Sequence, residues 1–241
     1  MARQAQKLTL LMTALWLATA QAPLAQESYS SRLGARGWSF STEVVLNGAE
    51  TAEMVIDSGS SFTIISTSVA KKMGLGELSR APRYPLSAAG GIVWVRLVVI
   101  DSVQVAGAMA HGVEGAVADL PSFKGAGGLL GKSFLDRFAW RIDGKAKSME
   151  LSAPQDEPLF GGRGQGWWRS NASRLARQAG LFRAMELGVE QSVHMGDSLD
   201  KPSMEKLSKT DAAMLASYYG RLLEVLRKEA EELRAPDEWV R

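Results

Sequence analysis

Short apolar segments, separated by glycine and polar turns, dominate the central part of the chain. Residues 38–46 have the composition of a β-strand, and Asn47-Gly48 directly after them is the strongest short signal for a hairpin turn. Residues 52–57 then return as the second strand. Because many more short strands and only one or two short helices follow, the pattern predicts a mostly β, barrel-like domain over residues 38–152.

A second, longer hairpin is predicted for residues 84–100. Its turn is formed by Ala88, Ala89, Gly90 and Gly91, and its second arm is a continuous apolar run.

The pattern changes after the β domain. Residues 153–166 contain glycine and proline without a periodic apolar pattern, which indicates a linker. Residues 167–235 have helical periodicity and predict two amphipathic helices that form a C-terminal hairpin. The two apolar stripes comprise Leu175, Ala179, Phe182, Met185 and Val189, and then Leu207, Met214, Tyr218, Leu222, Leu226 and Leu233. We expect these stripes to pack on each other or on the β domain; a dimerisation element and a substrate tether are the alternatives.

The first 25 residues have the pattern of an export signal. Arg3 and Lys7 give a positive start, a short apolar run follows, and residues 18–20 and 23–25 offer small residues for cleavage. The run of about 13 residues is shorter than the roughly 20 needed to span a bilayer. We therefore expect a periplasmic or secreted protein with no stable membrane span after cleavage, with an uncleaved anchor as the alternative.

Composition excludes several other classes of function. The 241 residues carry a formal net charge of only +2, which does not favour a nucleic-acid partner. The chain has no cysteine, so no disulfide, thiolate nucleophile or cysteine metal site is possible. Its two histidines, His111 and His194, lack the spacing of a helical zinc pair. We expect neither a metal nor another cofactor.

The segment with the clearest chemistry is an apolar strand that ends in Asp57-Ser58-Gly59. A second apolar segment, residues 128–131, lies about 70 residues downstream and ends in glycine ahead of a short predicted helix. With these two segments and the glycine-bearing hairpin, residues 38–152 resemble the retropepsin-like aspartic proteases, notably their exported bacterial members. The resemblance implies a single-lobe acid-protease barrel and does not extend to the helices.

The resemblance also implies the reaction and the roles of the site residues. Aspartic proteases hydrolyse peptide bonds with two carboxylates that share one proton and activate a water molecule between them. This sequence has one Asp-Ser-Gly, so the second carboxylate is expected from a symmetry mate in a homodimer, and Asp57 would be the catalytic residue. Ser58 is expected to brace the two loops across the dimer axis, and Gly59 to present its N–H group to a carboxylate.

Ser60 stands at a position where many retroviral relatives have alanine. A hydroxyl that donates to a carboxylate stabilises the ionised form, so we expect Ser60 to favour an acidic activity optimum. The four residues from Ala88 to Gly91 are expected to form a flap over a peptide or protein substrate. Tyr84 and Trp94 are candidates for the lining of the cleft, with core packing as the alternative for both.

Three alternatives compete with this interpretation. Residues 126–133 fit a loose phosphate-loop pattern but lack the preceding strand that such a loop requires. Ser68 and Lys71 match a Ser-x-x-Lys pattern whose companion motifs are missing. The third alternative is a non-catalytic dimerising or peptide-binding module of the same fold, since a fold alone does not prove activity.

Overall fold

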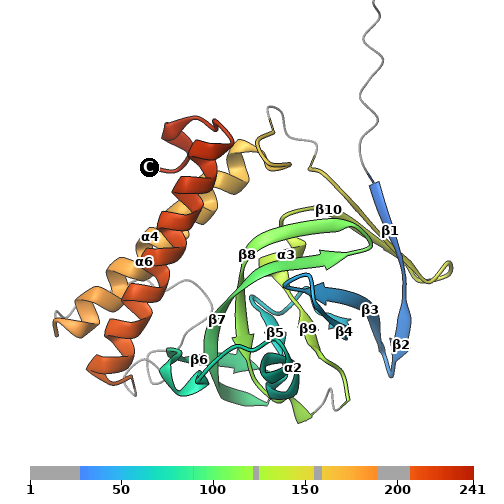
Figure 1. Ribbon diagram of the computed structural model, residues 1–241, viewed down its shortest axis with the longest axis horizontal. Helices are drawn as coiled ribbons and strands as arrows, with labels where there is room; N and C mark the ends of the chain where they lie inside the picture. Colours follow the sequence, from blue (N-terminus) through green and yellow to red (C-terminus); the bar gives the residue numbers. More distant parts are fainter. Residues whose placement is uncertain (1–27, 89, 122–124, 155–158, 189–206) are drawn as a thin grey trace, which may run out of the picture.

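The β-strands form two sheets in a computed structural model that describes residues 28–88, 90–121, 125–154, 159–188 and 207–241 (Figure 1). The larger sheet has eight strands in the order β2-β3-β4-β9-β5-β8-β7-β6 within these described residues. Its strands are β2 (Gly34–Arg36), β3 (Ser39–Leu46), β4 (Glu50–Ile56), β5 (Thr63–Ile65), β6 (Arg83–Ala88), β7 (Gly91–Val105), β8 (Ala108–Val117) and β9 (Gly128–Leu130). Two short helices, α2 (Thr67–Lys72) and α3 (Lys132–Leu135), and a 3-10 turn (Leu78–Arg80) lie between them.

The predicted hairpin at Asn47-Gly48 is present between β3 and β4. Both turn residues have positive φ angles, 50° at Asn47 and 67° at Gly48, as a turn matched to the twist of the strands requires. At its far end β3 also pairs with β7, through Val45 with Gln104 and Leu46 with Val103. This additional pairing curls the sheet into a barrel.

Strands β7 and β8 are longer than the sequence pattern indicates. The second arm of the predicted hairpin, residues 92–100, continues to Val105 as one strand, because the ladder to β8 runs from Arg96 to Val105. Polar residues interrupt the apolar pattern at Asp101 and Ser102, but the ladder resumes with Ser102 opposite His111.

The β domain begins before the predicted start at Trp38. Strand β1 (Ser28–Arg32) pairs antiparallel with β11 (Ser148–Ser152), which also pairs with β10 (Ala139–Asp143) to form a three-stranded sheet. Leu33, between β1 and β2, is buried in the core. The polar sequence of β1 gives no strand signal of its own, since its position depends on pairing with a strand about 120 residues away. The predicted export signal, residues 1–25, lies outside the described residues.

Strand β9 lies between β4 and β5 in the large sheet and holds these two segments together. It pairs parallel with β4 and antiparallel with β5. A side chain at Gly128 would overlap the carbonyl group of Ile64, and one at Gly131 would overlap that of Phe62. The close packing of these three segments therefore requires glycine at both positions.

The C-terminal region forms the predicted helical hairpin, α4 (Gln165–Glu186) with α6 (Lys209–Glu232), followed by the 3-10 turn η3 (Asp237–Trp239). Helix α4 begins inside the stretch that reads as a linker, and Arg163 in that stretch is buried against Glu229 of α6. Val189 lies outside the described residues. No helix in the described part of the chain is both long and apolar enough to span a membrane.

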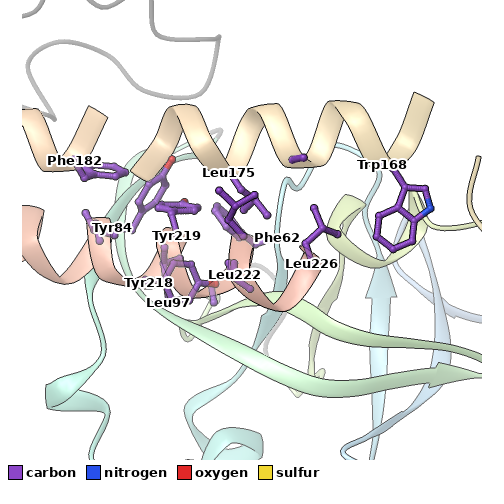
Figure 2. Close-up of a cluster of buried hydrophobic side chains, with 14 of the residues drawn as sticks. Phe62, Tyr84, Leu97, Trp168, Leu175, Phe182, Tyr218, Tyr219, Leu222 and Leu226 are labelled. Carbon is purple, nitrogen blue, oxygen red and sulfur yellow. The ribbon is translucent and has the colours of Figure 1, made fainter. Parts of the chain in front are cut away.

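Buried side chains fall into two clusters. One fills the barrel and includes Met54, Ile65, Leu130 and Phe134. The other lies between the sheet and the helical hairpin, whose helices cross one face of the barrel (Figures 1 and 2). Its labelled members in Figure 2 are Phe62, Tyr84, Leu97, Trp168, Leu175, Phe182, Tyr218, Tyr219, Leu222 and Leu226. The predicted mostly β, single-lobe barrel with a C-terminal helical hairpin is confirmed.

We expect Gly131→Ala to lower the free energy of unfolding by more than about 3 kcal/mol, because the added methyl group would meet backbone rather than a movable side chain. Urea unfolding followed by tryptophan fluorescence measures the change. Gly180→Ala is the matched control, since its Cβ meets nothing within 4 Å in an exposed turn of α4, and it should stabilise slightly. Equal stability of the two variants would contradict the role of Gly131.

Candidate active site

Asp57 lies immediately after β4, at the point where that strand meets β9. Its backbone N–H donates to the carbonyl of Leu130 at 3.1 Å, so the parallel ladder extends as far as Asp57. The residue is half-buried, whereas Ser58 and Gly59 are exposed. A rigid element therefore holds the Asp57 backbone, and its carboxylate reaches the surface at an exposed turn.

The turn after Asp57 is closed by the aspartate itself. The N–H of Gly59 donates to Oδ1 of Asp57 at 2.9 Å, and the N–H of Ser60 donates to the Asp57 carbonyl at 3.2 Å. The predicted contact from Gly59 to a carboxylate is thus present within one subunit. This geometry is also that of an ordinary aspartate turn, so it fixes the carboxylate without by itself assigning a reaction.

The side chain of Ser60 has a different partner from the one predicted. Its hydroxyl is buried and donates to the carbonyl of Phe62 at 2.7 Å. The predicted hydrogen bond to Asp57 is therefore wrong for this arrangement, because the turn directs the Ser60 side chain into the protein. Ser60 stabilises the turn, and its hydroxyl gives no support for an acidic activity optimum.

The first residues of helix α3 bind the C-terminal end of the loop that follows Asp57. The N–H groups of Lys132 and Ser133 donate to the carbonyls of Ser60 and Ser61 at 2.8 and 3.2 Å. In return, the N–H of Thr63 donates to the Ser133 hydroxyl at 2.8 Å. The two segments that carry the resemblance, about 70 residues apart, are thus joined by a network of hydrogen bonds.

The predicted flap is the turn between β6 and β7. Ala88 closes β6, Gly91 opens β7 with a φ of 110°, and Ala88, Gly90 and Gly91 are all exposed. Ala89 lies outside the described residues. The two arms pair from Arg83 with Arg96 to the tip, which makes a protruding two-stranded ribbon.

Of the two aromatic candidates for the cleft, Tyr84 is a core residue. Its ring makes edge contacts with Phe62 at 5.5 Å and with Phe182 of α4 at 6.4 Å (Figure 2). Burial, followed by the charge of Glu114, raises the pKa of Tyr84 to about 12. Trp94 is half-buried, and the guanidinium group of Arg83 lies 4.6 Å from the centre of its ring.

Charged contacts that the sequence did not reveal join the hairpin to the barrel. Arg174 of α4 donates to both carboxylate oxygens of Glu114 on β8, and Glu114 is buried. Burial alone would lower the pKa of Arg174, but the charge and hydrogen bond of Glu114 outweigh it, and the pKa is raised. Burial, with a smaller contribution from Arg163, lowers the pKa of Arg137 to about 10. Nothing in the sequence pairs residues 60 positions apart, so these contacts carry no sequence signal.

The phosphate-loop alternative fails on the same geometry. The N–H groups of Gly127, Lys132 and Ser133 already donate to the carbonyls of Glu53, Ser60 and Ser61. They are therefore not available to surround a phosphate, and Lys132 pairs with Asp136 at the surface.

The remaining alternatives find no support in the described residues. The Ser68 hydroxyl of the Ser-x-x-Lys pattern bonds to Ser66, the N-cap of α2, at 2.9 Å. Within the described part of the chain, no group of three His, Cys, Asp or Glu side chains is placed to hold a metal ion. His194 lies outside that part.

Comparison with known proteins finds a family whose sequence pattern matches the barrel. Residues 42–137 match the sequence model of the family described as gag-polyprotein putative aspartyl protease. These residues run from β3 past α3 and include the Asp57 turn, the flap ribbon and β9. This match agrees with the resemblance of the barrel to retropepsin-like aspartic proteases that its sequence predicts. Similarity to this family suggests aspartic peptidase activity.

Among solved structures, the chain is similar to a retropepsin-like aspartic protease from Rickettsia conorii, with 22% sequence identity and a TM-score of 0.40. The similarity covers 53% of this chain and 93% of the other. No curated protein matches the chain significantly.

The pKa of Tyr84 leads to a prediction for stability at high pH. Below about pH 10 the phenol of Tyr84 is protonated in both the folded and the unfolded protein. Above pH 10 the phenol ionises in the unfolded chain, whereas in the folded protein it stays neutral to about pH 12. The free energy of unfolding should therefore fall by about 1.4 kcal/mol per pH unit from this residue as the pH rises between these values.

Tyr84→Phe should remove this part of the alkaline slope. Denaturant unfolding of both proteins at pH 8 gives the packing cost of the substitution, because the phenol is neutral there in both states. The difference between the proteins should then shrink as the pH approaches 12. A constant difference from pH 8 to 12 would rule out burial of the phenol.

Proposed function

We propose that the protein is an aspartic endopeptidase whose catalytic dyad is formed by Asp57 of two subunits. The observation that carries the proposal is the position of Asp57 within a retropepsin-like domain, on a turn that β4, β9 and α3 hold by backbone hydrogen bonds. A carboxylate fixed in this way loses little freedom on binding a water and a peptide, which is the preorganisation that hydrolysis requires.

The dyad would act on a water molecule held between the two carboxyl groups. Because two carboxylates at close range cannot both ionise easily, the pair shares one proton. The ionised member takes a proton from water as the water oxygen attacks the peptide carbonyl carbon, and the protonated member donates its hydrogen bond to the developing oxyanion. Transfer of a proton to the amide nitrogen then breaks the C–N bond and releases the two products.

Two features support a homodimer. The sequence has a single Asp-Ser-Gly, so one subunit supplies one carboxylate of the pair. Ser58 and Gly59 are exposed at the tip of the turn, where a two-fold axis would bring the two loops together. The Ser58 hydroxyl would then brace the partner loop, and the ribbon that ends at Ala88 and Gly91 would close over the substrate.

We also propose that the enzyme works outside the cytoplasm. The export pattern of residues 1–25 supports this location. The absence of cysteine is compatible with an oxidising compartment, since no thiol is available to be oxidised there.

A peptide-binding or dimerising module is the second candidate. The geometry of the aspartate turn favours this candidate, because Asp57 could serve only to close its own turn, with no part in catalysis. The position of the turn within a protease domain favours the enzyme, since closure of the turn does not account for the rest of the family pattern.

Asp57→Asn should lower the rate of peptide cleavage by at least about a hundredfold, since an amide cannot take a proton from water at neutral or acidic pH. The assay uses a peptide library with the protein that lacks residues 1–25, at pH values from 3 to 8. Asp101→Asn is the matched control, because Asp101 is exposed on β7, and it should retain activity. Undiminished cleavage by the Asp57 variant would exclude the dyad, whereas a folded dimer without any cleavage would favour the binding module.

Mixing the two proteins tests whether one active site needs both subunits. If subunits exchange freely in an equimolar mixture of wild type and Asp57→Asn, about one quarter of the dimers contain two wild-type chains. Activity per wild-type chain should then fall to about half. An activity that stays proportional to the wild-type concentration, with exchange shown by subunit labels, would mean that each subunit acts alone.

A further inference from the structure

The helical hairpin covers the face of the sheet on which Val55 lies, two residues before Asp57. Side chains two positions apart on a strand point to the same side, and the ladder through the N–H of Asp57 keeps this alternation from Val55 to Asp57. Val55 belongs to the buried cluster that the hairpin covers, together with Ile64 and Leu129 from the neighbouring strands. The hairpin therefore stands beside the Asp57 turn rather than behind the sheet.

The hairpin leaves the candidate site open. Asp57 is half-buried, and Ser58, Gly59 and Ser61 are exposed, so α4 and α6 do not cover the turn. Their contact with the barrel begins at Phe62 and Tyr84, beside which the rings of Phe182 and Tyr219 stack at 5.7 Å (Figure 2). The hairpin therefore lies beside the Asp57 turn and does not block access to it.

A cavity of about 220 Å³ lies between the hairpin and the barrel. It starts at Ser61 and Phe62, directly after the Asp57 turn, and extends between α3 and α4. Arg174 and Gln178 lie one turn apart on α4, and both line it. The cavity thus joins the protease domain to a segment outside the matched residues 42–137.

Both acidic side chains that line the cavity are already paired, and Arg137 donates to the backbone carbonyls of His111, Gly112 and Ser133. Arg174 binds both oxygens of Glu114, and Lys132 pairs with Asp136 at 3.1 Å. By contrast, Oε1 of Gln178 is buried and has no hydrogen-bond partner among the described residues. A buried polar atom without a partner costs free energy, which a ligand that completes the bond recovers.

The unpaired Oε1 of Gln178 can accept a hydrogen bond, which limits the kind of ligand that the cavity can bind. An ionised carboxylate has no hydrogen to donate to Oε1, and an apolar side chain leaves the atom unpaired. A lysine ammonium group would enter a site lined by three basic side chains, Lys132, Arg137 and Arg174, against two acidic ones. A carboxamide both donates and accepts without bringing a charge, so it fits in either orientation of the Gln178 amide.

We propose that this cavity is an outer subsite of the peptide cleft that binds an asparagine or glutamine side chain of the substrate, with Gln178 as a specificity-determining residue. The proposal rests on the proposed endopeptidase function. The hairpin then supplies part of the substrate-binding surface, which accounts for its fixed attachment to the barrel through Arg174 and Glu114.

The test compares peptides that differ only in Gln, Glu or Leu at each position within four residues of the bond that is cut. At one outer position, the wild type should cleave the Gln peptide about tenfold faster in kcat/KM than the Leu or Glu peptides, the value of one buried hydrogen bond. Gln178→Met, which keeps the length of the side chain, should lose this preference, so that the Gln, Glu and Leu peptides are cleaved with similar kcat/KM at that position. Arg177→Leu, an exposed neighbour on α4, is the control and should keep the preference.

The outcomes separate this proposal from the function on which it rests. Cleavage that depends on Asp57 but shows no preference for an amide at any outer position overturns the subsite and leaves the endopeptidase intact. A preference that persists in Gln178→Met overturns the role of Gln178. The complete absence of cleavage that depends on Asp57 removes the proposed function, and the subsite with it.

Discussion

The close packing of β9 between β4 and β5 is the constraint on which the rest of the barrel depends. Backbone passes against backbone there, and only glycine at positions 128 and 131 leaves the necessary room. Because β9 pairs with both neighbours, this packing sets the register of Asp57 relative to Leu130. The same chain then turns into α3, whose first N–H groups hold the loop that follows Asp57. One tight contact thus positions the strand, the turn and the short helix together.

The helical hairpin is attached by a different kind of contact. Aromatic rings from both parts form a buried cluster, and ion pairs stand at its border, with Arg163 on Glu229 and Arg174 on Glu114. Buried ion pairs add little net stability, but removal of one partner is costly, so they specify one arrangement over others. The hairpin is therefore held in a defined orientation beside the Asp57 turn, which a purely apolar contact would fix less strictly.

Those parts of the fold that follow from local chemistry could be predicted from the sequence. Asn47-Gly48 adopts the positive φ angles that its hairpin requires, and the small residues from Ala88 to Gly91 form the turn of the second ribbon. Asp57 lies at the end of its strand, as the apolar run before it indicates. The apolar stripes of the helices also mark much of their buried faces, with Leu175, Phe182, Tyr218 and Leu222 all buried.

What the sequence did not reveal depends on partners that are distant along the chain. Strand β1 has a polar sequence and exists through its pairing with β11. The hydroxyl of Ser60 turns to Phe62 because of the path of the loop, which no residue pattern expresses. Glu114 and Gln178 likewise line a common cavity only because α4 packs against β8 and α3, which no residue pattern predicts.

The contacts of the Asp57 loop also bear on whether the domain acts as an enzyme or as a binding module. Nearly all the bonds that shape the loop are made by its backbone and by the buried hydroxyl of Ser60. In the described part of the chain, one oxygen of Asp57 accepts from Gly59, and the Ser58 side chain makes no hydrogen bond. A loop that needed these side chains only for its shape would use them more fully. Their availability at an exposed, firmly held turn is what a shared active site between two subunits requires.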